Sequence, residues 1–171
     1  MRIHAYAPTR IDLAGGTLDL WPLYLFHPGA LTVNVAITRY AHAVVEPRRD
    51  RRIVLLSRDS GRSQTYASLA ALAASRSHRL PLLAELVAWI APRQGLTLTT
   101  WSEAPAGAGL GGSSTMAVAL CAALTRWLGQ RMPAADWIPL SRDIEARVLS
   151  VPTGEQDHYP AVFGGLSAVH L

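Results

Sequence analysis

The sequence predicts an α+β domain in which a mixed sheet packs against a buried helix that follows a glycine-rich loop. Apolar runs bounded by glycine, proline and charged turns fill the first third of the chain, as is typical of strands. Helical patterns come later, and strands and helices do not alternate strictly, which disfavours a doubly wound parallel sheet. The pattern over Ser113–Leu128 is apolar on nearly every face, which predicts a central helix.

Each element is expected from its apolar pattern and from the residues that bound it. Pro81 opens the second helix, Pro92 and Gly95 follow it, and Gly129 stops the buried helix. In chain order, the expected elements are strands Arg2–Ala7 with a short continuation to Leu13, Leu31–Thr38, Tyr40–Glu46 and Ile53–Arg58, a short helix Ala67–Ala74, a helix Leu82–Ala91, a strand Leu96–Trp101, helices Ser113–Leu128 and Ala134–Val148, a loop Ser150–Pro160 and a strand Val162–Leu171.

Length and composition are those of one globular domain, because the chain has 171 residues, half of them hydrophobic and 16% charged. No run approaches the ~20 uncharged apolar residues that a membrane-spanning helix requires, and the amino terminus lacks the apolar core of a signal peptide. We therefore expect no membrane partner and a cytoplasmic location. The single cysteine, Cys121, lies in an apolar helical pattern and is expected to be a buried small hydrophobe.

All sixteen basic residues are arginine, so any mechanism that needs a lysine from this chain is excluded. The arginines are dispersed except around positions 48–52, where a solvated hairpin tip is favoured over a nucleic-acid site. The six histidines form no i,i+4 pair and have no partnering cysteines. A preformed transition-metal site is therefore not expected.

A loop with four glycines, residues 105–115, precedes the buried helix and favours phosphate binding. Glycine lets the backbone approach a ligand closely, and the free N–H groups and positive dipole at a helix start attract an anion. A mobile loop with a serine N-cap is the structural alternative. The expected nucleotide-binding residues are Pro105, Gly107, Gly109, Leu110, Gly111, Gly112, Ser113, Ser114 and Thr115.

Other phosphate-loop chemistries fit less well. A Walker A loop and a protein-kinase site both need a lysine, which the chain lacks. Gly107, Gly109 and Gly112 satisfy the dinucleotide pattern G-x-G-x-x-G. A dinucleotide-binding fold, however, also requires a second strand that ends in an acidic residue about 20 residues further along the chain. The sequence offers Asp136 inside a helical pattern instead. A dinucleotide-binding oxidoreductase domain stays as a less favoured alternative.

The glycine-rich run PAGAGLGGSST resembles the signature loop of the GHMP kinases (galactokinase, homoserine kinase, mevalonate kinase and phosphomevalonate kinase), P-x-G-x-G-L-G-S-S-S/A, with Gly112 in place of the usual serine. Residues 7–19, APTRIDLAGGTLD, are similar to the first motif of that superfamily. Residues 152–159, PTGEQDHY, followed by FGG at 163–165, resemble its third region. The first motif and the third region most resemble the branch of the D-glycero-D-manno-heptose 7-phosphate kinases and related sugar kinases. The galactokinase sequence Gly-Glu-His-Thr-Asp is absent.

The resemblance implies an ATP-dependent kinase that transfers a phosphoryl group to a hydroxyl of a sugar or sugar phosphate, with ATP and Mg²⁺ as cofactors. In such a reaction an aspartate can accept the proton of the attacking hydroxyl, and a neighbouring arginine stabilises its charge. Asp12, on a strand, is expected to be structural. By resemblance, the catalytic residues are Asp157 and Arg10, the magnesium ligands are Ser113 and Glu145, and the substrate contacts are Asp19, Gly16 and His158.

The resemblance also implies that residues 1–171 form the N-terminal, ATP-binding domain of such a kinase. Full members carry a second domain that completes the substrate pocket, and here the predicted elements end on an apolar strand. We therefore expect the C-terminal domain to be missing from this chain or supplied separately. A non-catalytic nucleotide-binding module is the alternative function, although pure binding needs no base such as Asp157. The sequence names neither the acceptor nor the oligomeric state.

Overall fold

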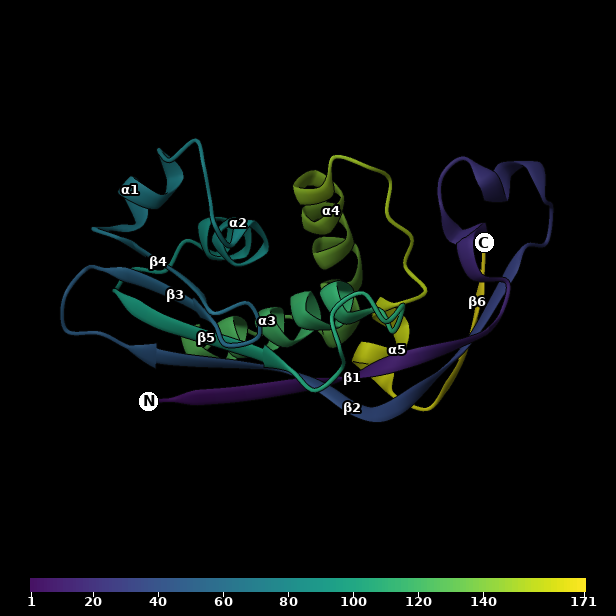
Figure 1. Cartoon of the computed structure of the whole chain (residues 1–171), viewed down its shortest axis with the longest axis horizontal. Helices are drawn as coiled ribbons and strands as arrows, with labels where there is room; N and C mark the ends of the chain where they lie inside the picture. Colours follow the sequence, from purple (N-terminus) through teal and green to yellow (C-terminus); the bar gives the residue numbers. More distant parts are fainter.

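A seventeen-residue strand, β2, organises the sheet of the computed structural model, which describes residues 1–171 (Figure 1). β1 runs antiparallel along β2, the first half of β2 also pairs with β6, and its second half pairs with β5. β3 lies parallel to β5 and forms a hairpin with β4, so the strand order is β1-β2-β5-β3-β4 with β6 attached to β2. The strands are β1 (Ile3–Ala14), β2 (Leu31–Pro47), β3 (Ile53–Ser57), β4 (Arg62–Tyr66), β5 (Leu96–Ser102) and β6 (Leu166–His170).

The central helix, α3, packs on β1 and β2, and α2 and α4 pack against it (Figure 1). Its middle residues are buried beside the alanines of β2, because small side chains such as Ala117 and Ala41 let helix and sheet approach closely. No helix combines the length and apolar character needed to cross a bilayer. The helices are α1 (Leu69–Ala73), α2 (Pro81–Ile90), α3 (Gly112–Leu128), α4 (Trp137–Leu149) and α5 (His158–Phe163), with short 3₁₀ turns η1 (Gly16–Asp19), η2 (Leu23–Phe26) and η3 (Ala134–Asp136).

The α+β class, the mixed sheet and the buried helix after the glycine loop are confirmed. Gly129 ends α3 in the left-handed conformation at φ 68°, as expected of a glycine stop. Cys121 is fully buried, and burial raises the pKa of its thiol to about 12, so it acts as an apolar core residue.

Several element boundaries differ from the expectation. The first two expected strands merge into β1 and the next two into β2, because β1 pairs with β2 on both sides of the expected breaks, with a register shift between Pro8 and Arg10. β4 was not expected, since its sequence RSQTY is polar and pairs only at the sheet edge. The expected loop Ser150–Pro160 contains the start of α5, where Pro160 is tolerated in the first helical turn. Gly164 and Gly165 both have positive φ and delay the last strand to Leu166.

Candidate active site

The glycine loop joins the end of β5 to the start of α3 and needs its glycines for backbone conformation. Gly107, Gly109 and Gly111 have φ of 76°, 70° and 68°, a region that residues with a Cβ rarely adopt. Gly111 is the N-cap of α3, and no side chain caps the helix start. The first N–H groups of α3 are therefore available to an anion, and the helix dipole favours one there.

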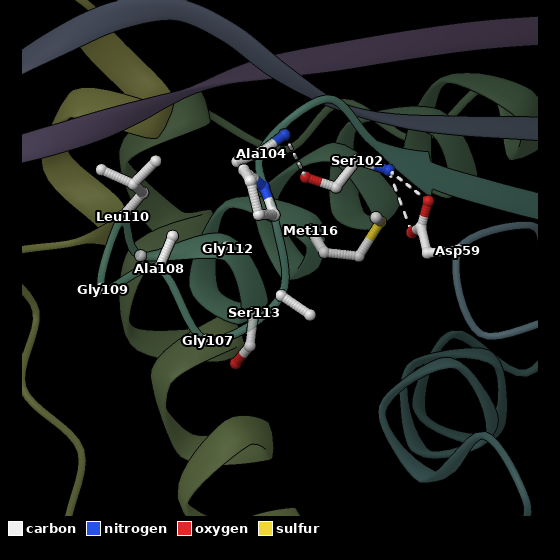
Figure 2. Close-up of a pocket in the computed structure, with 13 residues that line it drawn as sticks. Asp59, Ser102, Ala104, Gly107, Ala108, Gly109, Leu110, Gly112, Ser113 and Met116 are labelled. Atoms are coloured by element: carbon white, nitrogen blue, oxygen red, sulfur yellow. Dashed lines mark hydrogen bonds between the residues drawn. The ribbon is translucent and has the colours of Figure 1, made fainter.

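A cavity of about 360 Å³ lies against this loop, within the range of about 300–1,000 Å³ typical of small-molecule pockets. We call it the glycine-loop pocket. Its far side is formed by Asp59, Ser102 and Met116, which the sequence did not single out (Figure 2). Both carboxylate oxygens of Asp59 lie 3.0 Å from the backbone nitrogen of Ser102, so the turn after β3 is tied to the end of β5. The rest of the lining is Ala104, Pro105, Ala106, Gly107, Ala108, Gly109, Leu110, Gly111, Gly112 and Ser113.

A second cavity, of about 390 Å³, adjoins the first, and we call it the carboxylate pocket. Its walls come from β1, η1, the end of α4 and the segment before α5. Gly109 lines both pockets, so they meet at the glycine loop. The polar and charged lining of the carboxylate pocket is Arg10, Asp12, Thr17, Asp19, Thr153, Ser114, Glu145, Gln156 and Asp157.

Arg10 and Asp157, which lie 147 positions apart, form an ion pair in this pocket. The Nε and Nη2 atoms of Arg10 are 2.7 and 2.5 Å from Oδ1 of Asp157, and Nη1 donates to the carbonyl of Gly109 at 2.7 Å. The Arg10 backbone N–H also donates to the Leu110 carbonyl. Arg10 is 8% exposed and therefore fixes the carboxylate relative to the glycine loop.

Asp19 is held at the opposite wall by the segment before α5. Its Oδ2 accepts the backbone N–H of Gln156 at 2.9 Å, and the Gln156 side chain donates to the carbonyl of Gly16 at 3.3 Å. A Cβ on Gly154 would lie 1.8 Å from Asp19 Oδ2, so only glycine fits beside this carboxylate. Burial raises the pKa of Asp19 above its usual range, and the charge of Asp157 adds to the rise, although the Gln156 N–H partly offsets it.

Glu145 of α4 lies beneath the start of α3 and accepts hydrogen bonds from two serines. Ser114 Oγ donates to Oε2 at 2.7 Å, and Ser113 Oγ donates to Oε1. The residue is 5% exposed. Burial opposes ionisation, but polar contacts from His158, Ser113 and Ser114 outweigh it, so the pKa of Glu145 lies below its usual value. The carboxylate is therefore ionised at neutral pH.

Two side chains lie elsewhere than the sequence predicted. His158 was expected to contact substrate, but its ring is fully buried behind Glu145 and does not line either pocket. Thr115 was expected to offer its hydroxyl to a nucleotide, but it is buried and donates to the carbonyl of Gly111 at 2.8 Å within the helix. Packing of α5 and α3 in the interior therefore determines where His158 and Thr115 lie.

Asp12 was expected to be structural, yet it lines the carboxylate pocket. Its Oδ1 atom is buried and has no hydrogen-bond partner. Asp12 follows Arg10 by two positions on β1, so the two side chains point to the same face of the sheet. This two-residue spacing was the sequence signal that could have placed Asp12 in the site.

The comparisons with known proteins agree on one family. Residues 67–165, more than half of the chain, match the family model described as the GHMP kinases N terminal domain. The chain is 31% identical over 170 residues to a D-glycero-alpha-D-manno-heptose 7-phosphate kinase of Campylobacter jejuni, with 96% of this chain and 49% of that protein covered. It is 28% identical over 185 residues to an L-fucokinase/L-fucose-1-P guanylyltransferase of Bacteroides fragilis, covering 94% of this chain and 19% of that protein.

Among solved structures, a D-glycero-D-manno-heptose 1-phosphate kinase from Bacteroides thetaiotaomicron superposes with a TM-score of 0.89 at 30% identity, over 99% of this chain and 56% of that one. The mevalonate kinase of Methanococcus jannaschii, at 13% identity and a TM-score of 0.84, shares the fold. The chain thus spans about half the length of the heptose-phosphate kinases that it matches.

Proposed function

Because the chain belongs to the GHMP kinases through their N-terminal domain, we propose that it is the nucleotide-binding part of an ATP-dependent kinase acting on a hydroxyl of a sugar or sugar phosphate. One observation carries the proposal: the glycine-loop pocket and the carboxylate pocket meet at Gly109. A phosphoryl donor in the first pocket would thus face an acceptor in the second. Phosphoryl transfer depends mainly on such positioning and on charge stabilisation.

The nucleotide phosphates are proposed to lie on the loop and on the free N–H groups at the start of α3. Glycines at 107, 109 and 111 leave the backbone open to close approach, and no residue lies within 4 Å of a Cβ built at Gly107 or Gly109. The nucleoside would extend towards Ser102 and Met116, which line the glycine-loop pocket but not the carboxylate pocket.

Asp157 is proposed to orient the acceptor hydroxyl and accept its proton. Both contacts from Arg10 fall on Oδ1 of Asp157, which leaves Oδ2 free to take the hydrogen bond of the hydroxyl. As the oxygen attacks the γ-phosphorus and the bond to the ADP oxygen breaks, the hydroxyl proton passes to that carboxylate. Arg10 holds the carboxylate beside the glycine loop through the Gly109 carbonyl.

Glu145 and Ser113 are proposed to hold magnesium. The donor set fits a hard cation, because it offers an ionised carboxylate and a hydroxyl oxygen at the helix start where phosphates would lie. No group of three or more His, Cys, Asp or Glu side chains gathers into a metal site, so the remaining ligands would be phosphate oxygens and water. When bound, magnesium would neutralise charge on the β- and γ-phosphates.

The acceptor is proposed to be a heptose phosphate or a similar sugar, by analogy with the heptose-phosphate kinases and the fucokinase that the chain resembles. Asp12 and Asp19 line the acceptor side of the carboxylate pocket and can accept hydrogen bonds from sugar hydroxyls. Gly16, whose carbonyl is held by Gln156, precedes Thr17 of the same wall and is proposed to lie close to the sugar. A C-terminal domain, as part of the same protein or as a separate chain, is proposed to complete this pocket, and the cytoplasm is the proposed location.

The test is nucleotide binding followed by turnover. We expect MgATP and MgADP to bind, measured by calorimetry, and Gly109→Val to abolish binding because its side chain would enter the space of the phosphates. NAD serves as the control ligand, since tight NAD binding would support a dinucleotide-binding domain. Turnover is measured on D-glycero-D-manno-heptose 7-phosphate, D-glycero-D-manno-heptose 1-phosphate and L-fucose, with the C-terminal domain supplied. Binding without turnover on any sugar would favour a non-catalytic module.

A further inference from the structure

We infer that His158 is a positioning residue that orients Glu145 for its cation, an inference that rests on the proposed function. His158 opens α5, directly after Asp157. Its ring is completely buried, and Nε2 lies 3.4 Å from Oε2 of Glu145. The resemblance places a glutamine at this position in related kinases, whereas this chain has a histidine.

The ring has no other polar contact. Neither Nδ1 nor Nε2 makes a hydrogen bond, although buried polar groups are nearly always paired. Leaving such a group unpaired costs about 1–3 kcal/mol, so a purely apolar side chain would fill this space at lower cost. Glu145 is the carboxylate that lies beside the ring. Its contact with the imidazole explains why a histidine occupies this buried position.

Glu145 is contacted from two sides by different helices. Ser113 and Ser114 of α3 donate to its oxygens from the pocket side, and His158 of α5 faces Oε2 from behind. The 3.4 Å separation exceeds the usual 2.7–3.2 Å of a hydrogen bond, so a carboxylate movement of a few tenths of an ångström towards the ring would complete the bond. An imidazole N–H in this place limits the carboxylate to orientations that keep Oε2 near it.

Groups that hydrogen-bond a metal-ligating carboxylate commonly change metal affinity by 10–100-fold when removed. We therefore expect His158→Leu, which keeps an apolar side chain but has no donor, to weaken MgADP binding 10–100-fold. ADP without metal, measured in EDTA, should bind equally to both proteins. His158→Gln retains an N–H donor and should bind MgADP within a few-fold of the parent.

The experiment is calorimetric titration of the parent and variants with MgADP and with metal-free ADP, and of Mn²⁺ into the ADP complexes by electron paramagnetic resonance. Ile144→Val is the control, because Ile144 is 7% exposed, belongs to the hydrophobic core and precedes Glu145, and the change shortens an apolar side chain without removing any polar group. The control should leave the ratio of MgADP to ADP affinity unchanged.

Unchanged MgADP affinity in a folded His158→Leu protein would overturn the inference, as would equal losses in the leucine and glutamine variants. If the leucine variant does not fold, the imidazole ¹⁵N signals of His158 in the parent decide the matter: they should shift when Mg²⁺ is added to the ADP complex, and signals that stay in place overturn the inference. A parent protein that binds ADP in EDTA but gains nothing from Mg²⁺ contradicts the positioning role and the magnesium site at Glu145 and Ser113, but leaves nucleotide binding at the glycine loop standing. Failure to bind any adenine nucleotide contradicts the proposed function as well.

Discussion

Replacing Gly111 by alanine tests whether the position of Asp157, rather than the loop alone, controls turnover. Gly111 has φ +68°, and a Cβ there would lie 3.1 Å from both Cγ and Oδ2 of Asp157. Favourable carbon contacts begin near 3.5 Å, so the carboxylate must move by a few tenths of an ångström. Its contacts with Arg10, at 2.5 and 2.7 Å, oppose that movement.

Gly107→Ala is the matched control. Gly107 lies in the same loop at φ +76°, but a Cβ there meets nothing within 4 Å. Both substitutions should lower the free energy of unfolding by about 1–2 kcal/mol, the cost of a left-handed conformation for a residue with a Cβ. Since a misplacement of 1 Å costs about 100-fold in rate, a shift of a few tenths of an ångström at Gly111 should lower kcat roughly 3–10-fold more than the control does.

The assay combines urea unfolding of each variant with kcat measured, with the C-terminal domain supplied, at saturating ATP and saturating sugar acceptor, so that altered nucleotide affinity at Gly107 does not enter the comparison. Equal losses of unfolding free energy and unequal kcat values are the expected result. If the two variants have the same kcat, Gly111 does not act on turnover through Asp157, and the assignment of the carboxylate position as rate-controlling is wrong.

Asp157→Asn should leave ATP affinity intact and lower kcat by roughly 10²–10⁴, the usual contribution of a general base. Near-parental kcat in a folded variant would show that Asp157 is not the general base. Asp19→Asn should raise Tm at pH 7 and change it little near pH 4, because a raised folded-state pKa means that the buried carboxylate destabilises the fold as pH rises through that pKa. Equal Tm changes at both pH values would contradict this account of Asp19. Asp12→Asn should raise the KM for the sugar several-fold and leave the KM for ATP unchanged, because its buried Oδ1 has no protein partner and is available to a sugar hydroxyl. An unchanged KM for the sugar would indicate that Asp12 has only a structural role.

The sequence alone determined those features whose signals are local. The buried helix Ser113–Leu128, its glycine stop and the glycine-rich turn before it follow from periodicity and glycine placement within about 25 residues, and the structure has all three, whereas anion binding by that loop stays a prediction. The resemblance of three motifs in order also determined the family, which the family model and the superposed structures confirm. The resemblance also predicted that Arg10 and Asp157 act as a pair, because each lies in one of these motifs.

Only the tertiary structure decided which polar side chains face the pockets. His158 stands next to Asp157 in the chain, yet the first turn of α5 turns its ring inward between packed helices, whereas Asp157 points out. Asp12 lies in the site because the carboxylate pocket forms over the face of β1 that carries Arg10 and Asp12. Exposure of this kind depends on how α3, α4 and α5 converge on the sheet. Contacts between segments far apart in the chain determine how these helices pack. The residue pattern within one segment does not indicate those contacts.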